Sequence, residues 1–174
     1  TPVRSGMMIV NQQRAHIRIL YDKYRSQMDG QPVSTQGLLF PEVVQFSIAD
    51  ALLLEEATDE LKALGFELSP LGGGSFAVNG MPAGLEDIQP AVLLTNIVES
   101  IKDKSTGMEA DIQHRLALTI ARSAAIVVGQ ALTNAEMDNL INQLFACPNP
   151  NHTPDGKLIV TILQYADIER MFKA

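Results

Sequence analysis

Amphipathic helical stretches alternate along this chain with short apolar runs, and that alternation limits the fold more than any other feature. In each helical stretch the apolar side chains recur every three or four residues, which builds one apolar face. The predicted helices cover residues 17–28, 48–64, 91–103, 109–130, 135–145 and 166–172. The predicted strands cover residues 7–10, 38–40, 43–46, 66–68, 76–78 and 158–163. A chain that mixes both kinds of element throughout is expected to be α/β or α+β.

Residues that start or stop elements support these boundaries. Thr133 and Glu136 have the spacing of a capping box, in which each side chain bonds the other's backbone where a helix begins. Gly65 follows the second helical stretch, at the place where a residue with positive φ often ends a helix. Pro41 is expected to interrupt the strand region, and residues 72–74, all glycine, predict a flexible hairpin loop.

The chain is acidic, with 20 Asp and Glu against 13 Lys and Arg in 174 residues and a net charge of −7. Binding nucleic acid phosphates needs clustered positive charge, so the chain is not expected to grip DNA by itself. The single cysteine, Cys147, excludes a disulfide framework and a four-cysteine zinc site within the chain. No apolar run approaches the ~20 residues of a membrane helix, and no signal peptide is visible. The chain begins at Thr1 and is expected to be a piece of a longer protein.

Three segments together resemble the C-terminal domain of the MutL family of DNA mismatch repair proteins. Residues 8–22 are similar to the family's first strand and helix, which carry Asp-Gln-His-Ala and two glutamates. Leu64-Gly65-Phe66 resembles the family's leucine-glycine-phenylalanine turn. Residues 143–157 are similar to its cysteine-proline-histidine-glycine-arginine loop. The resemblance spans nearly the whole chain and implies a two-lobed domain of the α/β (α+β) class.

The resemblance implies that residues 1–35 and 116–174 form a dimerisation lobe, with residues 36–115 inserted as an outer, regulatory lobe. The helical stretch after Arg122, with Val127 and Val128, is apolar around most of its circumference. We expect it to be deeply buried, and a symmetric partner is one way to cover it. The residues expected at the dimer interface are Met8, Val10, Leu20, Tyr24, Val160, Ile162, Met171 and Phe172.

Many members of the family are metal-dependent endonucleases, and the resemblance places their metal-binding positions on this chain. Such a site needs carboxylates, imidazole or thiolate that converge on one point. In the first motif the family's Asp, His and first Glu positions hold Asn11, Gln13 and Ile17, and only Asp22 remains acidic. The thiolate position of the long helix holds Arg122, whose positive charge would repel a metal ion.

The last family motif is changed as well, since its Cys position holds Thr153 and its His position holds Asp155. The resemblance therefore implies that the nuclease is absent and that this chain binds no metal and no other cofactor. The alternative is a relocated metal site that uses Asp22, His152 and Asp155, which would make the chain a metal-dependent endonuclease.

Residues 36–41, which run Gln36-Gly37-Leu38-Leu39-Phe40-Pro41, are similar to the family's sliding-clamp-binding peptide. Gln36 would hydrogen-bond at one end of a groove on the clamp, and Pro41 would stiffen the segment. Leu38, Leu39 and Phe40 would supply apolar anchors. The alternative is an ordinary strand with Leu38 and Phe40 in the core. The two interpretations are compatible, because an edge strand can also be a docking strand.

The function that the resemblance implies is homodimerisation of a mismatch repair ATPase. Joined tails would hold two ATP-binding N-terminal halves, which precede Thr1, at high effective concentration. In this interpretation the chain itself is not an enzyme. Its implied partners are a second copy, the sliding clamp and other repair proteins such as MutS, with DNA contacted mainly by the N-terminal half. The implied location is the cytoplasm, at the nucleoid, with no membrane contact.

Overall fold

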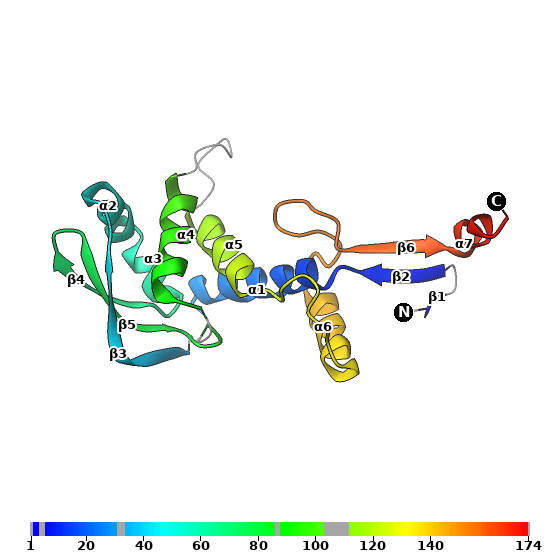
Figure 1. Cartoon of the computed structure of the whole chain (residues 1–174), viewed down its shortest axis with the longest axis horizontal. Coiled ribbons are helices and arrows are strands. Elements are labelled where there is room, and N and C mark those ends of the chain that lie inside the picture. The colour runs from blue at the N-terminus through cyan, green and yellow to red at the C-terminus, as the bar shows by residue number, and fades with distance from the viewer. Residues whose placement is uncertain (1, 4–5, 31–33, 86–87, 103–111, 174) are drawn as a thin grey trace. The chain divides into compact units, whose positions relative to one another are not determined.

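The computed structural model describes residues 2–3, 6–30, 34–85, 88–102 and 112–173. Contacts divide the chain into two compact units, one of residues 1–19 with 125–174 and the other of residues 20–124 (Figure 1). Helices and antiparallel strands occur in both units, so the fold class is α+β, as predicted. The lobes expected from the sequence, 1–35 with 116–174 and 36–115, have boundaries that differ from these. The assignment of dimerisation to the lobe of the chain ends stays a prediction.

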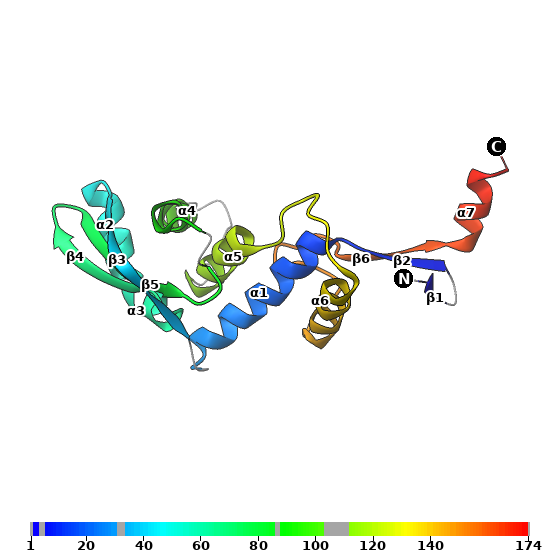
Figure 2. The same ribbon diagram turned by 60° about the horizontal axis from the view of Figure 1, so that its bottom comes forward.

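The sheet of the first unit joins strands from opposite ends of the chain. Strand β2 (Gly6–Val10) lies between β1 (Pro2–Val3) and β6 (Val160–Gln164), and both pairings are antiparallel (Figures 1 and 2). The register of β2 with β6 is unbroken from Gly6 opposite Gln164 to Val10 opposite Val160. A Cβ atom at position 6 would collide with the carbonyl oxygen of Leu163, so this close pairing requires glycine.

Helix α6 (Asn134–Ala146) begins at the predicted capping box. The Glu136 N–H donates to the Thr133 hydroxyl at 3.3 Å, and the Thr133 N–H donates to the Glu136 carboxylate at 2.7 Å. These bonds from the Thr133 backbone and side chain hold the pKa of Glu136 below its ordinary value. The start of α6 is therefore fixed by local bonds that the sequence spacing alone predicts.

The core of the first unit forms where α6 meets the beginning of α1 (Gln12–Met28) and the residue before β6. Its buried members are Ala15, Leu140, Leu144 and Ile159. Val10 and Val160 pack against this cluster from the sheet, so the core also braces the two paired strands. The described chain then continues from β6 into a short helix, α7 (Tyr165–Met171).

The described residues of the second unit form the rest of α1, four further helices and a second antiparallel sheet. The strands stand in the order β3 (Thr35–Gln45), β5 (Ser75–Pro82), β4 (Glu67–Gly72). The helices are α2 (Ile48–Glu56), α3 (Thr58–Ala63), α4 (Pro90–Lys102) and α5 (Ile112–Ala124). Its core includes Leu54, Val78, Leu94, Ile97, Leu116 and Ile120, all fully buried. Of the helices described in either unit, none has the length and hydropathy that crossing a membrane requires.

The predicted helix of residues 48–64 is two helices, α2 and α3, which meet at Ala57. Ala57 belongs to neither helix, and its ψ of 10° departs from helical geometry. Gly65 follows α3 with the expected positive φ, here 96°. The sequence therefore located both ends of the helical region and missed the break inside it, because no proline or glycine marks that break.

Helix α5 ends at Ala124 rather than at residue 130, and the expectation of deep burial for this end is wrong. Val127 and Val128 lie beyond the helix and are 70% and 78% exposed. β-Branched residues lose side-chain freedom in a helix, which favours leaving it here. The Ile126 N–H donates to the His16 ring at 3.0 Å, so a side chain of α1 accepts a hydrogen bond from the backbone just past the helix end. The start of this predicted helix, residues 109–111, lies outside the described residues.

Candidate functional site

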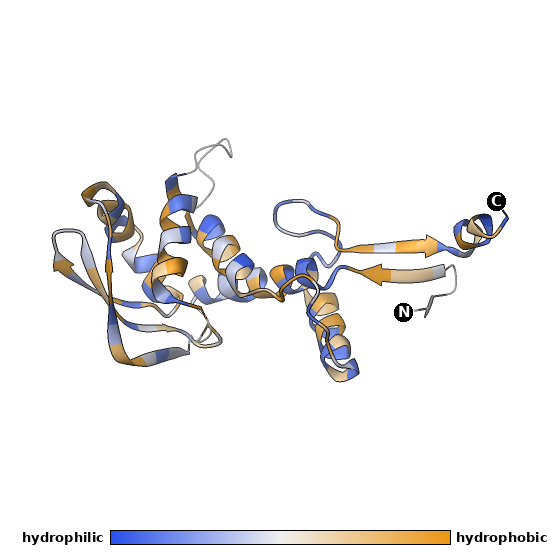
Figure 3. Cartoon of the chain, in the orientation of Figure 1, coloured by the Kyte–Doolittle hydropathy of each residue, from blue (hydrophilic) through white to orange (hydrophobic). Residues whose placement is uncertain are grey.

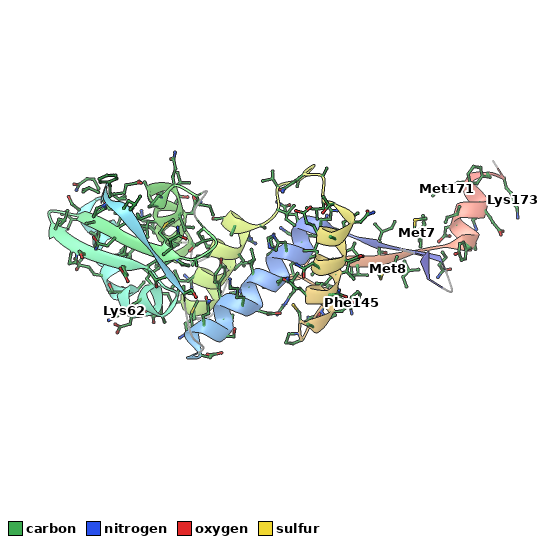
Figure 4. All side chains as sticks on the ribbon, turned by 90° about the horizontal axis from the view of Figure 1, so that it is seen from below. Met7, Met8, Lys62, Phe145, Met171 and Lys173 are labelled. Atoms are coloured by element: carbon green, nitrogen blue, oxygen red, sulfur yellow. The ribbon has the colours of Figure 1, made fainter. Side chains whose placement is uncertain are left out.

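The ribbon formed by β2 and β6 consists largely of hydrophobic residues (Figure 3). Residues opposite each other in an antiparallel pair share a face, and successive residues alternate between faces. One face, here called the inner face, carries Met8, Val10, Val160 and Ile162. The other, the outer face, carries Met7, Ile9, Thr161 and Leu163. The neighbouring side chains of Met7 and Met8 accordingly project to opposite sides of β2 (Figure 4).

Helix α6 covers only part of the inner face. Val10 packs against the core cluster, and Met8 lines a hollow of about 160 Å³ together with Met137, Leu140 and Ile141 of α6. Ile162, which lies opposite Met8, remains 49% exposed. The inner face is therefore closed near the core and open toward the far end of the ribbon.

The outer face and helix α7 expose further apolar side chains. Met7 is 47% exposed and Ile9 is 46% exposed. Helix α7 has no buried residue among those described: Tyr165 is 50% exposed, Met171 is 68% exposed, and Phe172 just beyond the helix is 85% exposed. A strand that is apolar on both faces is normally covered on both. The ribbon and α7 thus form a surface that is suited to burial against another molecule.

Six of the eight expected interface residues lie on these elements: Met8, Val10, Val160 and Ile162 on the ribbon, and Met171 and Phe172 at the end of α7. Of these, Val10 and Val160 pack against the core cluster of their own unit. Leu20 and Tyr24 belong to the second unit. Tyr24 is 2% exposed, and burial raises the pKa of its hydroxyl to about 12. Its side chain offers almost no surface to a partner, so we leave it out of the interface.

The expected interface residues on the ribbon all fall on the inner face. The structure adds the exposed Met7, Ile9 and Tyr165, which lie within the segments 7–10 and 158–172 that the sequence assigns to the interface. The signal was present, because a run of four consecutive apolar residues is apolar on both sides of a strand.

Asn11 stands where the metal-binding pattern has Asp, and here it caps helix α1. Its side-chain oxygen accepts from the Arg14 N–H at 3.0 Å, and its own N–H donates to the Ile159 carbonyl at 3.0 Å. The Arg14 guanidinium donates to the Leu158 carbonyl at 2.7 Å. An amide oxygen serves well as a helix cap, so Asn11 has a structural role that needs no metal ion.

Thr153 and Asp155 shape the turn before β6. Thr153 is 3% exposed, and its hydroxyl accepts from the Lys157 N–H at 2.9 Å. The Asp155 carboxylate pairs with the Lys157 ammonium at 3.1 Å. Both side chains therefore act within one tight loop, in contacts that organise its backbone.

The positions of the metal pattern divide between the two units. The first unit holds Asn11, Gln13, Ile17, Thr153 and Asp155, and the second holds Asp22 and Arg122. Gln13 and Ile17 lie half-buried on the first turns of α1. Among the described residues, no group of three or more His, Cys, Asp or Glu could hold a metal ion.

The clamp-like segment lies in β3, at one edge of the second unit's sheet. The pairing of β3 with β5 shifts between Gly37 and Glu42, so that residues 38–41 face a single residue of β5. A bulge of this kind forces the extra residues out of the ladder. Pro41 does not end the strand as expected, because an edge strand tolerates a residue that lacks an N–H.

The bulge exposes its apolar side chains. Leu39 is 94% exposed and Phe40 is 86% exposed, so the interpretation that buries Phe40 in the core is wrong. Leu38 is partly buried and, with Gln36 and Met81, lines a hollow of about 230 Å³. The segment therefore combines a shallow hollow with two protruding apolar anchors.

An α+β chain whose paired terminal strands and last helix expose apolar side chains has the features of a self-associating module. Comparison with known proteins agrees, because the family described as the MutL C terminal dimerisation domain matches residues 2–132. This chain belongs to that family.

The relatives are DNA mismatch repair proteins. The chain is 49% identical over 173 residues to the MutL protein of Phocaeicola vulgatus and 45% identical over 173 residues to that of Bacteroides fragilis. It is 31% identical over 170 residues to the MutL protein of Chlorobaculum tepidum. The matches cover 98–99% of this chain and only 27–28% of those proteins. The chain thus spans about 28% of the length of its curated relatives.

Proposed function

We propose that this chain forms a homodimer through the ribbon surface and α7, and that it thereby joins two copies of a larger mismatch repair protein. The observation that carries the proposal is the exposure of apolar side chains on paired strands and on the helix that follows them. Leaving Met7, Ile9, Ile162 and Phe172 in water costs free energy that a second copy recovers by covering them. A two-fold pairing supplies matching apolar surfaces from both copies.

Dimerisation would act on the parts of the parent protein outside this chain. Two ATP-binding halves tethered to one dimer meet at high effective concentration, which favours their ATP-dependent closure around DNA. The parent protein would work in the cytoplasm at the nucleoid, together with repair proteins such as MutS. No metal and no cofactor of this chain takes part in the proposal.

DNA contact is assigned mainly to those other parts of the parent protein. The second unit carries fifteen acidic and seven basic residues, and the first carries five acidic and six basic ones. Neither unit therefore has the excess of positive charge that binding to the DNA backbone requires. The acidity of the whole chain resides in the second unit, which leaves the proposed dimer surface close to neutral.

The clamp-like segment, residues 36–41, is proposed as the contact for the sliding clamp. Leu39 and Phe40 protrude from an edge strand, which suits them to enter an apolar groove on a partner. Gln36 is exposed beside them and can hydrogen-bond at the rim of such a groove. This contact uses the second unit and leaves the ribbon surface of the first unit available for the second copy.

Sedimentation velocity of the isolated chain tests the dimer proposal. Because the exposed surface is largely apolar, we expect a dimer at micromolar concentration. Dilution below the dissociation constant should then yield the monomer. A sedimentation coefficient that stays at the value of a monomer up to about 100 μM would refute it.

We also propose that this chain carries no nuclease chemistry. The support is the side chains at the family's metal positions: Ile17 cannot coordinate a metal, Arg122 is a cation, and Asn11 already caps a helix. Incubation with supercoiled plasmid and Mn²⁺ or Zn²⁺ is therefore expected to give no nicking above a metal-free control. Metal-dependent nicking that disappears in Asp22→Ala would instead establish the endonuclease alternative.

A further inference from the structure

We propose that the second copy docks on the free edge of β6, so that the two β6 strands pair antiparallel and one sheet continues through both copies. The inference rests on the proposed function, because it specifies how the second copy binds. It concerns backbone pairing along one strand edge, which is a narrower statement than burial of the ribbon surface.

Strand β6 is an edge strand with nothing in its sequence to prevent pairing. It stands last in the order β1–β2–β6 among the described strands. Its five residues, Val-Thr-Ile-Leu-Gln, include no charged residue and no proline. Its register with β2 has no bulge over all five pairs, so its outward N–H and C=O groups form a regular row. A regular, apolar edge of this kind is a template for another strand.

The other sheet of the same chain shows how an edge is protected. Strand β3 contains Pro41 and Glu42 and bulges between Gly37 and Glu42. Strand β4 contains Glu67 and Pro70, and its pairing with β5 shifts register twice. Prolines, charges and bulges are the means by which natural edge strands avoid unwanted pairing. Both edges of the second sheet are therefore protected against pairing with another strand. Strand β6 lacks this protection, as expected of an edge that pairs with a partner.

Self-pairing of β6 also accounts for the exposed helix that follows it. In an antiparallel pair about a two-fold axis, the end of each β6 lies beside the start of the other. Because α7 follows Gln164 directly, the pairing carries α7 of each copy toward the other copy's ribbon. Tyr165, Met171 and Phe172 can then cover the outer face of the partner, which α6 leaves open. Two groups of exposed apolar residues would thus cover each other.

Disulfide trapping locates the pairing. Two-fold antiparallel pairing requires that one residue of β6 faces its own copy, with Cβ atoms about 4.5–5.5 Å apart. Single cysteines are introduced at positions 160 to 164, one at a time, in a Cys147→Ser background that removes the native thiol. Met7→Cys and Ile9→Cys are matched controls on β2. In the proposed sheet the two β2 strands are about 14 Å apart, which is too far for a disulfide.

We expect mild oxidation to yield crosslinked dimers at one β6 position, with less at the positions on either side and none at positions 7 and 9. Amide exchange of the unsubstituted chain gives an independent reading. The β6 amides that face away from β2 should exchange at least about tenfold more slowly in the dimer than after dilution to monomer.

Two other results would overturn the inference. A chain that sediments as a dimer but crosslinks at position 7 or 9, and not on β6, would refute edge pairing while leaving the homodimer intact. A chain that remains a monomer at every concentration would refute the edge pairing and the proposed function together.

Discussion

Leu144→Ala is expected to lower the free energy of unfolding of the first unit by about 2–5 kcal/mol. Leu144 is fully buried and packs with Ala15, Leu140 and Ile159 in the core cluster of this unit. Truncation removes apolar contacts and leaves a cavity that the surrounding elements can close only in part. Urea unfolding followed by circular dichroism measures the loss as a lower transition midpoint with an unchanged slope.

The same substitution should weaken dimerisation, because Val10 and Val160 pack against this cluster and hold the ribbon in place. Gln143→Ala is the matched control, since this neighbouring residue of α6 is exposed and its side-chain amide donates to the Asn139 side chain one turn earlier. Its effect should stay within about 0.5 kcal/mol. An unfolding midpoint for Leu144→Ala equal to that of the control would mean that this cluster does not stabilise the unit.

Much of the fold can be predicted from local sequence signals, and the correct predictions depend on residues that are close together in the chain. The capping box at Thr133 and Glu136 and the positive φ of Gly65 depend on residues within one or two turns of each other. Such features need no knowledge of distant parts of the chain. The sequence predicts the strand at residues 7–10 for a similar reason, because a short continuous apolar run is typical of a strand.

The wrong or missing predictions concern features that depend on contacts between distant parts of the chain. The backbone after Ala124 is hydrogen-bonded by His16, which lies more than a hundred residues earlier in the chain. Nothing in the apolar run 124–128 predicts that hydrogen bond. The outward position of Leu39 and Phe40 depends on how β3 pairs with β5, since the bulge exists only relative to the partner strand. The edge position of β6 likewise follows from sheet order, which the sequence of β6 does not encode.

The candidate site was predictable in part for the same reasons. Helical and strand periodicity located Met8, Val10 and Ile162 on the ribbon, whereas Tyr24 has the same periodicity and lies in the core of the second unit. An amphipathic pattern indicates that a face is buried without indicating what buries it. Distinguishing a face covered by the same chain from one left for a partner requires the tertiary structure.

Ile9→Glu is expected to convert the dimer to monomer, with a dissociation constant raised at least about 100-fold. Ile9 is 46% exposed at the centre of the outer face, so the monomer accepts a carboxylate there at little cost. In the dimer the partner's α7 would cover this position and remove the charge from water. Loss of an apolar contact and burial of an unpaired charge together cost several kcal/mol, and two-fold symmetry imposes the cost twice. Since each 1.4 kcal/mol changes the dissociation constant tenfold, about 100-fold is a lower estimate.

Leu52→Glu is the matched control for this variant. Leu52 is a similarly exposed aliphatic residue, 54% exposed, and it lies on α2 of the second unit. Sedimentation equilibrium of the two variants and the parent chain should give an unchanged dissociation constant for Leu52→Glu alone. Because burial disfavours the ionised carboxyl, the Glu introduced at position 9 has a higher pKa in the dimer than in the monomer. Dimerisation then takes up protons, so lowering the pH from 7 toward 5 should partly restore the Ile9→Glu dimer. If Ile9→Glu folds normally and dimerises as tightly as Leu52→Glu at pH 7, the outer face of the ribbon is not part of the interface.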